Sequence, residues 1–224
     1  MIGGTSGLAY DVAHLLGAVV LLHSFALIYQ RRLFSLLNVF AAQALFLAAA
    51  AAWQGHIQGA GHLYLTALIT AVLKGIVIPV ALHRIVVRLS IHRTVDPAIG
   101  TGAALAMGIG LVGLSIALVL PLTDRATALT REDLALALSV VLLGLLMMIS
   151  RRNAVSQVVG FMSIENGLVL AAVGVQGMPF VVEMSIAFSV LVAFIIFGIF
   201  IFHIRERFDS LDVPYVETFR GEGR

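Results

Sequence analysis

Long apolar runs separated by short polar segments dominate the chain. A helix needs about 20 consecutive apolar residues to cross the hydrocarbon core of a bilayer. Runs of about that length fall at residues 8–29, 33–53, 63–83, 98–120, 133–149, 154–175 and 179–203. The pattern predicts an all-α, polytopic membrane protein with about seven transmembrane helices.

The composition agrees with this prediction. Of 224 residues, 60% are hydrophobic and 12% are charged, which leaves too little polar surface to cover a soluble domain. The lipid bilayer is therefore the expected environment, and no basic face suits nucleic acid. The chain contains no cysteine, which excludes disulfides, cysteine-ligated zinc and iron–sulfur clusters within it. The first residues lack the basic region of a cleavable signal peptide, so the first apolar run is expected to remain as a helix.

The charges between the apolar runs predict an orientation. Every second connection is basic, through Arg31, Arg32, Arg84, Arg88, Arg93, Arg151, Arg152, Arg205, Arg207, Arg220 and Arg224. The other connections contain only Arg125 and Arg131, accompanied by Asp124, Glu132 and Asp133. By the positive-inside rule the N-terminus lies outside and the C-terminus in the cytoplasm.

A weak internal similarity suggests a duplication. At an offset of 122 residues Asp11 matches Asp133 and Leu16 matches Leu138, so helices 1–3 and 5–7 would be parallel repeats. Gln43 would then occupy the place of Glu165. Chance matches in a chain rich in Ala and Leu are the alternative.

Two glutamates lie in the last two apolar runs. Glu165 is the centre of the stretch GFMSIENGLVL, and Glu183 follows the short connection between the two helices. The two carboxyl groups are expected at similar depth on an antiparallel hairpin. Burial and a neighbouring acid bring such a pair toward neutral pH, where protons are exchanged. The alternative is that both are neutral, hydrogen-bonded packing groups.

Lys74, the only lysine, lies near the middle of the third apolar run. A buried ammonium must find an acid or lose its proton, so Lys74 is a candidate for proton transfer with Glu165 or with a neighbouring subunit. A structural ion pair is the alternative. Pro79 follows five residues later and is expected to kink or open the helix there.

The first apolar run carries a further candidate proton path. Asp11 and His14 are spaced to share one helix face near the outer end, and His23 lies more than two turns deeper. The alternative for such residues is ordinary interfacial solvation. Between Gly108 and Gly113 the letters G-x-G-x-x-G occur inside an apolar run, which indicates a close-packing helix face rather than a nucleotide site.

Residues 150–207 resemble a known family. The stretch SRRNAVSQVVGFMSIENGLVLAAV, followed by PFVVEMSIAFSVLVAFIIFGIFIFHIRER, resembles the NuoK-like membrane subunits of respiratory complex I. It is more similar to the longer HyfE-type subunit, component E of hydrogenase-4 and formate hydrogenlyase complexes. The resemblance implies three regions: a four-helix region at 1–132, a NuoK-like region at 133–207 and a cytoplasmic tail at 208–224. Glu165 matches the first family glutamate, and Glu183 matches the second less closely because the stretch between them is shorter.

The resemblance also implies a function. It suggests a non-catalytic subunit of a complex I-like, hydrogenase-linked respiratory complex in a bacterial or archaeal cytoplasmic membrane, relaying protons laterally through Glu165 and Glu183. Its partners would be antiporter-like membrane subunits, a NuoH-like membrane subunit and a hydrogenase or other redox arm. Nickel–iron and iron–sulfur centres would belong to those partners, and no cofactor is expected in this chain. The alternatives are a subunit of a multisubunit cation/proton antiporter and a stand-alone small transporter or seven-helix sensor.

Overall fold

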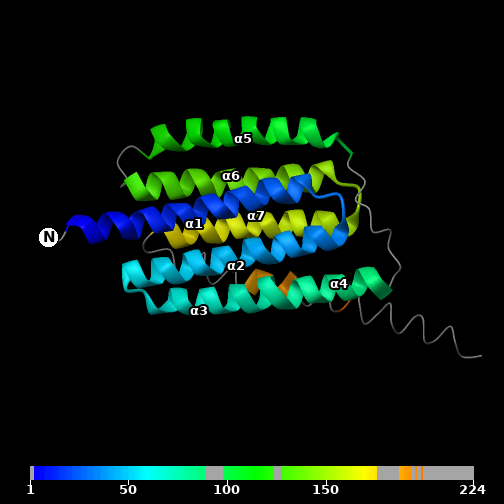
Figure 1. Ribbon diagram of the computed structural model, residues 1–224, viewed down its shortest axis with the longest axis horizontal. Coiled ribbons are helices and arrows are strands. Elements are labelled where there is room, and N and C mark those ends of the chain that lie inside the picture. The colour runs from blue at the N-terminus through cyan, green and yellow to red at the C-terminus, as the bar shows by residue number, and fades with distance from the viewer. Residues whose placement is uncertain are drawn as a thin grey trace, which may run out of the picture.

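A computed structural model describes residues 3–88, 98–123, 128–175 and 187–192, together with 195 and 198. This part of the chain is all-α (Figure 1). Its elements are α1 (Gly3–Tyr29), α2 (Leu33–Gln58), α3 (Gly61–Ile69), the π-helix η1 (Thr70–Val77), α4 (Ile78–Arg88), α5 (Thr101–Leu122), α6 (Ala128–Ser150) and α7 (Ala154–Gly174). The predicted fold class is confirmed for these residues.

Six helical segments are long and apolar enough to cross a membrane. They are α1, α2, the continuous unit α3–η1–α4, α5, α6 and α7, and they correspond to the first six predicted runs. The seventh predicted run, 179–203, lies mostly outside the described residues, among which 187–192 are helical. The described chain is therefore a multi-pass membrane protein, while the total of seven helices and the orientation stay predictions.

Two helix boundaries differ from the apolar runs because helices continue into polar sequence. α2 ends at Gln58, where Gly59 adopts a left-handed conformation with φ 65° that a residue with a Cβ seldom takes. α6 begins at Ala128, so Glu132 and Asp133 lie within the helix rather than in the connection before it. The division suggested at residue 133 therefore falls inside α6.

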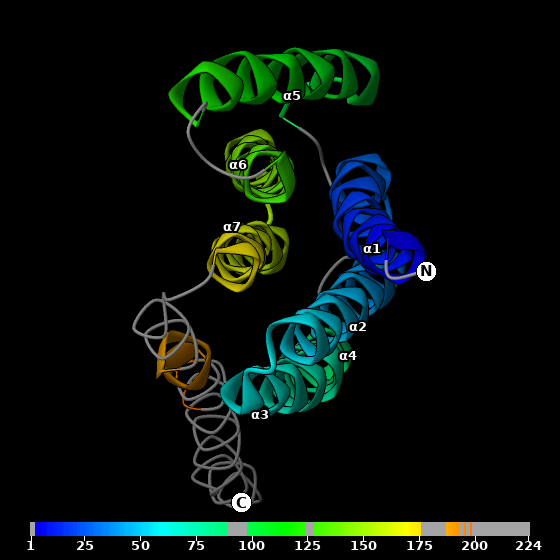
Figure 2. The ribbon, with the colours of Figure 1, turned by 90° about the vertical axis from the view of Figure 1, so that its left-hand side faces the viewer.

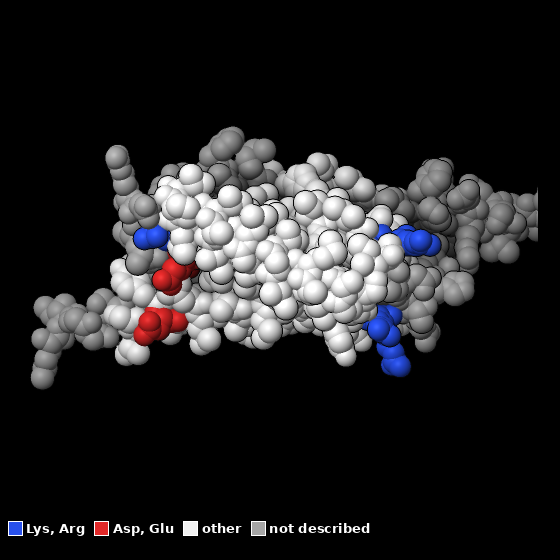
Figure 3. Space-filling view, turned by 90° about the horizontal axis from the view of Figure 1, so that it is seen from above, with Lys and Arg blue, Asp and Glu red and all other residues white. Residues whose placement is uncertain are grey.

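The helices run side by side along the long axis of the molecule (Figure 1). Viewed from one end, α5 lies at the periphery against α6, and α1, α2 and the α3–η1–α4 unit form an arc beside the α6–α7 hairpin (Figure 2). The connections that carry Arg31, Arg32 and Arg152 lie at one end of the bundle. Figure 3 shows basic side chains alone at one end of the visible face, and acidic side chains beside a basic one at the other.

α6 and α7 pack more closely than any other pair of described helices. A Cβ added at Gly144 would lie 2.7 Å from the backbone nitrogen of Ile164, and one added at Gly160 would lie 2.9 Å from that of Met148. On α7 the contact glycines Gly160, Gly167 and Gly174 recur every seven residues. Small residues that let two backbones approach are a common basis of helix association in membranes. We call this contact the glycine seam.

The glycines of α5 behave differently from the close-packing face that the sequence indicated. A Cβ at Gly108 would meet Leu143 at 2.9 Å and Phe25 at 3.0 Å, whereas a Cβ at Gly110 or Gly113 would have no neighbouring atom of the described residues within 4 Å. Gly108 and Gly110 are two apart on the helix and point to different sides, whereas Gly110 and Gly113 are three apart and lie on the same, open side. The prediction is confirmed for Gly108 and wrong for the other two.

Candidate functional site

A layer of polar side chains crosses the middle of the bundle between two apolar clusters. On α2, Leu36, Leu37 and Phe40 belong to one cluster and Leu47 and Ala51 to the other. Gln43 lies between them and is fully buried. Residues of the two apolar clusters also flank a polar segment along α7 and along the α3–η1–α4 unit. The buried polar residues between the clusters include Glu165 and Asn166 on α7 and Lys74 on η1. We call these side chains, with Ser24 and Ser163, the central polar layer.

Lys74 and Glu165 form an ion pair in this layer. The ammonium Nζ of Lys74 lies 3.0 Å from Oε1 of Glu165, and the two residues are 1% and 3% exposed. Nζ also donates a hydrogen bond of 3.0 Å to Oδ1 of Asn166. The Ser189 hydroxyl donates to Oε1 of Glu165. Ionised groups this deeply buried are stable only when paired and hydrogen-bonded, and both conditions are met here.

Amide and hydroxyl groups extend the layer from the ion pair to α1. Nδ2 of Asn166 donates to Oε1 of Gln43 at 3.2 Å. Nε2 of Gln43 in turn contacts the hydroxyl oxygens of Ser24 at 2.8 Å and Ser163 at 3.3 Å. The side chain that accepts a hydrogen bond from Lys74 is thus itself held in place by α2.

The pair lies at the centre of the membrane-spanning segments. Lys74 is thirteen residues from each end of the segment Gly61–Val87, which at about 1.5 Å per residue is roughly 20 Å from either end. Glu165 lies eleven residues after Ala154 and nine before Gly174. Charged groups at such depth are costly and usually mark ion or proton pathways.

The helix that carries Lys74 is irregular around it. Thr70–Val77 form a π-helix, which ends two residues before Pro79. In α-helical geometry the ring of Pro79 would clash with the carbonyl of Gly75, and the wider turn relieves this clash. The kink expected at Pro79 is therefore wrong in position, because the irregularity precedes the proline and contains Lys74. A Cβ at Gly75 would lie 2.9 Å from Cδ2 of Leu45, so the widened turn packs tightly on α2.

The second carboxylate oxygen of Glu165 has unused hydrogen-bonding capacity. Oε2 is buried and has no hydrogen-bond partner among the residues that the structure describes. A buried carboxylate oxygen in this state is suited to accept a proton or a further donor. Glu183, the other predicted glutamate, lies outside the described residues.

The predicted path along α1 is rearranged. Asp11 is exposed, and His14 turns to α6, where its imidazole lies 3.1 Å from Glu132 and 3.4 Å from Asp133. His23 contacts the Val19 carbonyl of its own helix through Nδ1, at 2.7 Å. The described contacts do not join Asp11, His14 and His23 to one another, and a shared proton path through them stays a prediction. The i, i+3 spacing placed Asp11 and His14 near each other but could not show which helix faces the imidazole.

Arg151 fixes the opposite end of the bundle. It is 3% exposed, and its Nη2 donates to the carbonyls of Leu27, Ile28 and Gln30 at the end of α1. Burial, and secondarily the nearby charge of Arg31, lower the pKa of Arg151 from its ordinary value. The sequence identified Arg151 only as a topology signal, whereas the structure shows that it joins the α6–α7 connection to α1.

The fold and the central polar layer together define a multi-pass membrane protein with an ion pair buried in the middle of its spans. The chain is similar to uncharacterized protein Rv0085 of Mycobacterium tuberculosis, with 27% identity over 203 residues that cover 90% of this chain and 92% of that protein. No protein-family model matches the chain. No solved structure matches it.

Proposed function

We propose that the chain is a membrane subunit of a complex I-like, hydrogenase-linked assembly and relays protons through Lys74 and Glu165. The observation that carries this proposal is the ion pair itself, which joins a base and an acid at 3.0 Å in the middle of the bundle. A structural role alone would be served by two uncharged polar groups without the cost of burying charge.

The pair can exist in two protonation states that both have zero net charge. Transfer of one proton from Nζ to Glu165 converts an ammonium and a carboxylate into a neutral amine and a carboxylic acid. The ionised state is stabilised by the hydrogen bonds from Lys74 to Asn166 and from Ser189 to Glu165. The neutral state avoids charge in a low-dielectric region. Because both states have zero net charge, a proton can shift within the pair without changing the charge of the buried layer, and a relay requires that uptake of one proton by the pair is accompanied by release of another.

The remaining parts of the proposal rest on the sequence resemblance. Glu183 would continue the relay laterally, toward antiporter-like subunits on one side and a NuoH-like subunit with a redox arm on the other. Nickel–iron and iron–sulfur centres would be carried by that arm, and the assembly would lie in a bacterial or archaeal cytoplasmic membrane. Within the described part of the family-like region, Asn153 caps α7 by accepting from the backbone nitrogens of Val155 and Ser156, and Glu165 lies three turns further into the helix.

The test is Glu165→Gln in the complete native assembly. The amide keeps the size and polarity of the side chain but cannot carry a proton, so the assembly should form and its ion translocation should be lost. Asp11→Asn is the matched control, because Asp11 is an exposed carboxylate of the same chain. An assembled Glu165→Gln complex that translocates ions at the wild-type rate would refute the relay.

The class of assembly is tested by gentle solubilisation, capture of the tagged chain and identification of the proteins that accompany it. A nickel–iron hydrogenase arm with large antiporter-like subunits supports the proposal. Antiporter subunits without a redox arm indicate the antiporter alternative. Recovery of the chain alone, with transport by the purified chain in liposomes, indicates a stand-alone transporter.

A further inference from the structure

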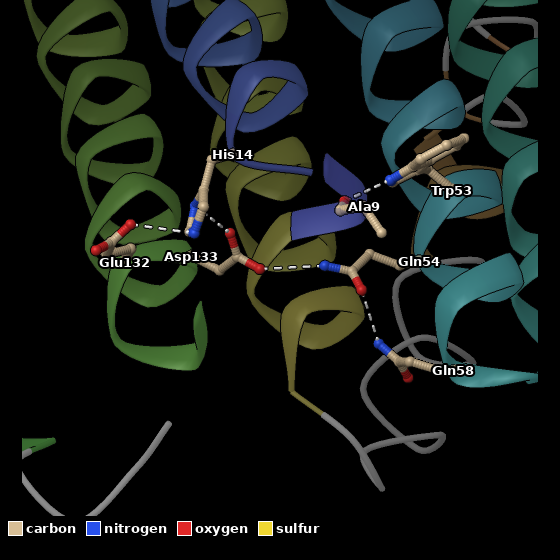
Figure 4. Close-up of polar contacts among 7 residues, drawn as sticks. All are labelled: Ala9, His14, Trp53, Gln54, Gln58, Glu132 and Asp133. Carbon is tan, nitrogen blue, oxygen red and sulfur yellow. Dashed lines mark hydrogen bonds and ion pairs between the residues drawn. The ribbon is translucent and has the colours of Figure 1, made fainter. Parts of the chain in front are cut away.

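A second polar cluster lies at the end of the bundle opposite Arg151, well separated from the central polar layer. His14 comes from α1, Glu132 and Asp133 from α6, and Gln54 and Gln58 from α2 (Figure 4). Gln54 lies eleven residues from Gln43 on the same helix, about 16 Å along the axis. The buried residues between them on α2 include Leu47, Ala48 and Ala51, which are apolar.

His14 stands between two carboxylates that differ in exposure. Its Nε2 lies 3.1 Å from Oε2 of Glu132, whose side chain is 59% exposed. Its Nδ1 lies 3.4 Å from Oδ1 of Asp133, whose side chain is 5% exposed. Nδ1 is itself buried and forms no hydrogen bond with the described residues. The ring thus presents one nitrogen to a surface acid and the other to a buried acid.

Asp133 is held firmly in its position. Nε2 of Gln54 donates to its Oδ2 at 3.2 Å, and Gln58 donates to Oε1 of Gln54 at 3.1 Å and to the Val173 carbonyl at 2.9 Å. A Cβ at Gly174 would lie 2.8 Å from Cβ of Asp133, so the last glycine of the seam provides the space for this residue. The Oδ1 atom that faces His14 is left for the imidazole.

We propose that His14 transfers protons between the exposed carboxyl group of Glu132 and the buried carboxylate of Asp133. In the inward step Nε2 takes a proton from the carboxyl of Glu132 as Nδ1 gives its own proton to Oδ1 of Asp133. The net result is one proton moved from Glu132 to Asp133, with the imidazole left in its other tautomer. The ring returns to its starting tautomer in the reverse step, when Asp133 gives its proton back to Nδ1 and Nε2 releases one to Glu132. Imidazole is suited to this role because each nitrogen can accept or release a proton near neutral pH.

The other described groups around His14 do not compete for this role. Arg131 of α6 directs Nη2 to the Leu120 carbonyl at the end of α5, at 3.0 Å. α2 faces Asp133 with the uncharged Gln54, and α7 faces it with Gly174. Asp11 on α1 is exposed. The proposal does not depend on Lys74, Glu165 or any partner subunit, so it can be tested on the chain alone.

The experiment is titration of the full chain in lipid nanodiscs with ¹⁵N-labelled histidine. The His14 signal is identified by its loss in His14→Gln. Because Oδ1 of Asp133 lies 3.4 Å from Nδ1, Asp133→Asn should change the balance between the two neutral tautomers of His14, which the ¹⁵N shifts of Nδ1 and Nε2 distinguish. Asp11→Asn should change it much less. Equal effects of the two variants, or no effect of Asp133→Asn, would overturn the proposal.

Infrared difference spectra between acidic and alkaline pH test the buried acid directly. The wild-type chain should show a protonated carboxyl band that is lost in Asp133→Asn. The pH at which half of this band has appeared should change in His14→Gln. This second variant keeps the test informative even where Asp133→Asn folds poorly. A spectrum without a band from Asp133, or a midpoint unaffected by His14→Gln, would show that the imidazole and Asp133 do not exchange protons.

Discussion

Removal of both partners of the buried ion pair should destabilise the bundle by less than the sum of the two single losses. At 3.0 Å and an effective dielectric constant near 20, the attraction between Lys74 and Glu165 is about 5.5 kcal/mol. Lys74→Met leaves the carboxylate buried without its counter-charge, which should lower the free energy of unfolding by about 3–5 kcal/mol. In the double variant with Glu165→Gln neither charge remains, so the loss should be smaller than the sum of the single losses by about 3 kcal/mol.

The chain offers a convenient assay for this cycle. Trp53 is the only tryptophan, and its Nε1 donates to the Ala9 carbonyl at 2.8 Å, so its fluorescence reports separation of α1 from α2. Unfolding by sodium dodecyl sulfate in maltoside micelles would be followed by this signal and by helical circular dichroism. The control is Lys74→Met combined with Asp11→Asn, which should be additive. The reasoning is refuted if the Lys74 and Glu165 variants are also additive within about 0.5 kcal/mol.

Two further predictions concern the glycine seam and the hydrogen bonds of Arg151, and both use the same unfolding assay. Gly167→Ala should destabilise the chain by about 1–3 kcal/mol, because its Cβ would lie 2.7 Å from Cγ2 of Val141 and 2.9 Å from the Ala137 carbonyl. Gly110→Ala, on an open helix face, should be neutral or stabilising, and equal losses in the two variants would contradict the glycine seam. Arg151→Met should cost about 1–3 kcal/mol because buried carbonyls at the end of α1 lose their donor. The exposed Arg152 is the control position, and a similar loss in Arg152→Met would show that the effect is one of charge alone.

The sequence predicted the helices and the two residues of the central ion pair because each depends on the energetic cost of burial alone. Six apolar runs became helices, and Lys74 was expected to need an acid such as Glu165, which is the partner that the structure shows. The proton-transfer role of the pair stays a prediction. The amide and hydroxyl groups around it were missed, although Gln43 and Asn166 were visible as uncharged polar residues in the middle of apolar runs. Their mutual contacts depend on how each helix is rotated about its axis, which an apolar run does not specify.

The second cluster was missed for a related reason. Asp133 was treated as the first residue of its apolar run, as a charge that opposes Arg131 and as a match to Asp11 in the suggested repeat, and no contact with α1 was inferred. Once α6 begins at Ala128, Asp133 is one full turn inside the helix and faces α1. A kink or opening was expected at Pro79, whereas the structure has a π-helix at Thr70–Val77, because a proline indicates a disturbance but not the direction in which the backbone relieves it.

The glycine seam has a mechanical consequence for both acid–base pairs. Because the backbones of α6 and α7 touch along their length, the two helices form a single stiff body. This body carries both acids, Asp133 and Glu165, whereas their basic partners His14 and Lys74 belong to α1 and η1. A shift of the hairpin relative to its surroundings would therefore change both separations at once, although the two pairs lie at different depths and share no side chain.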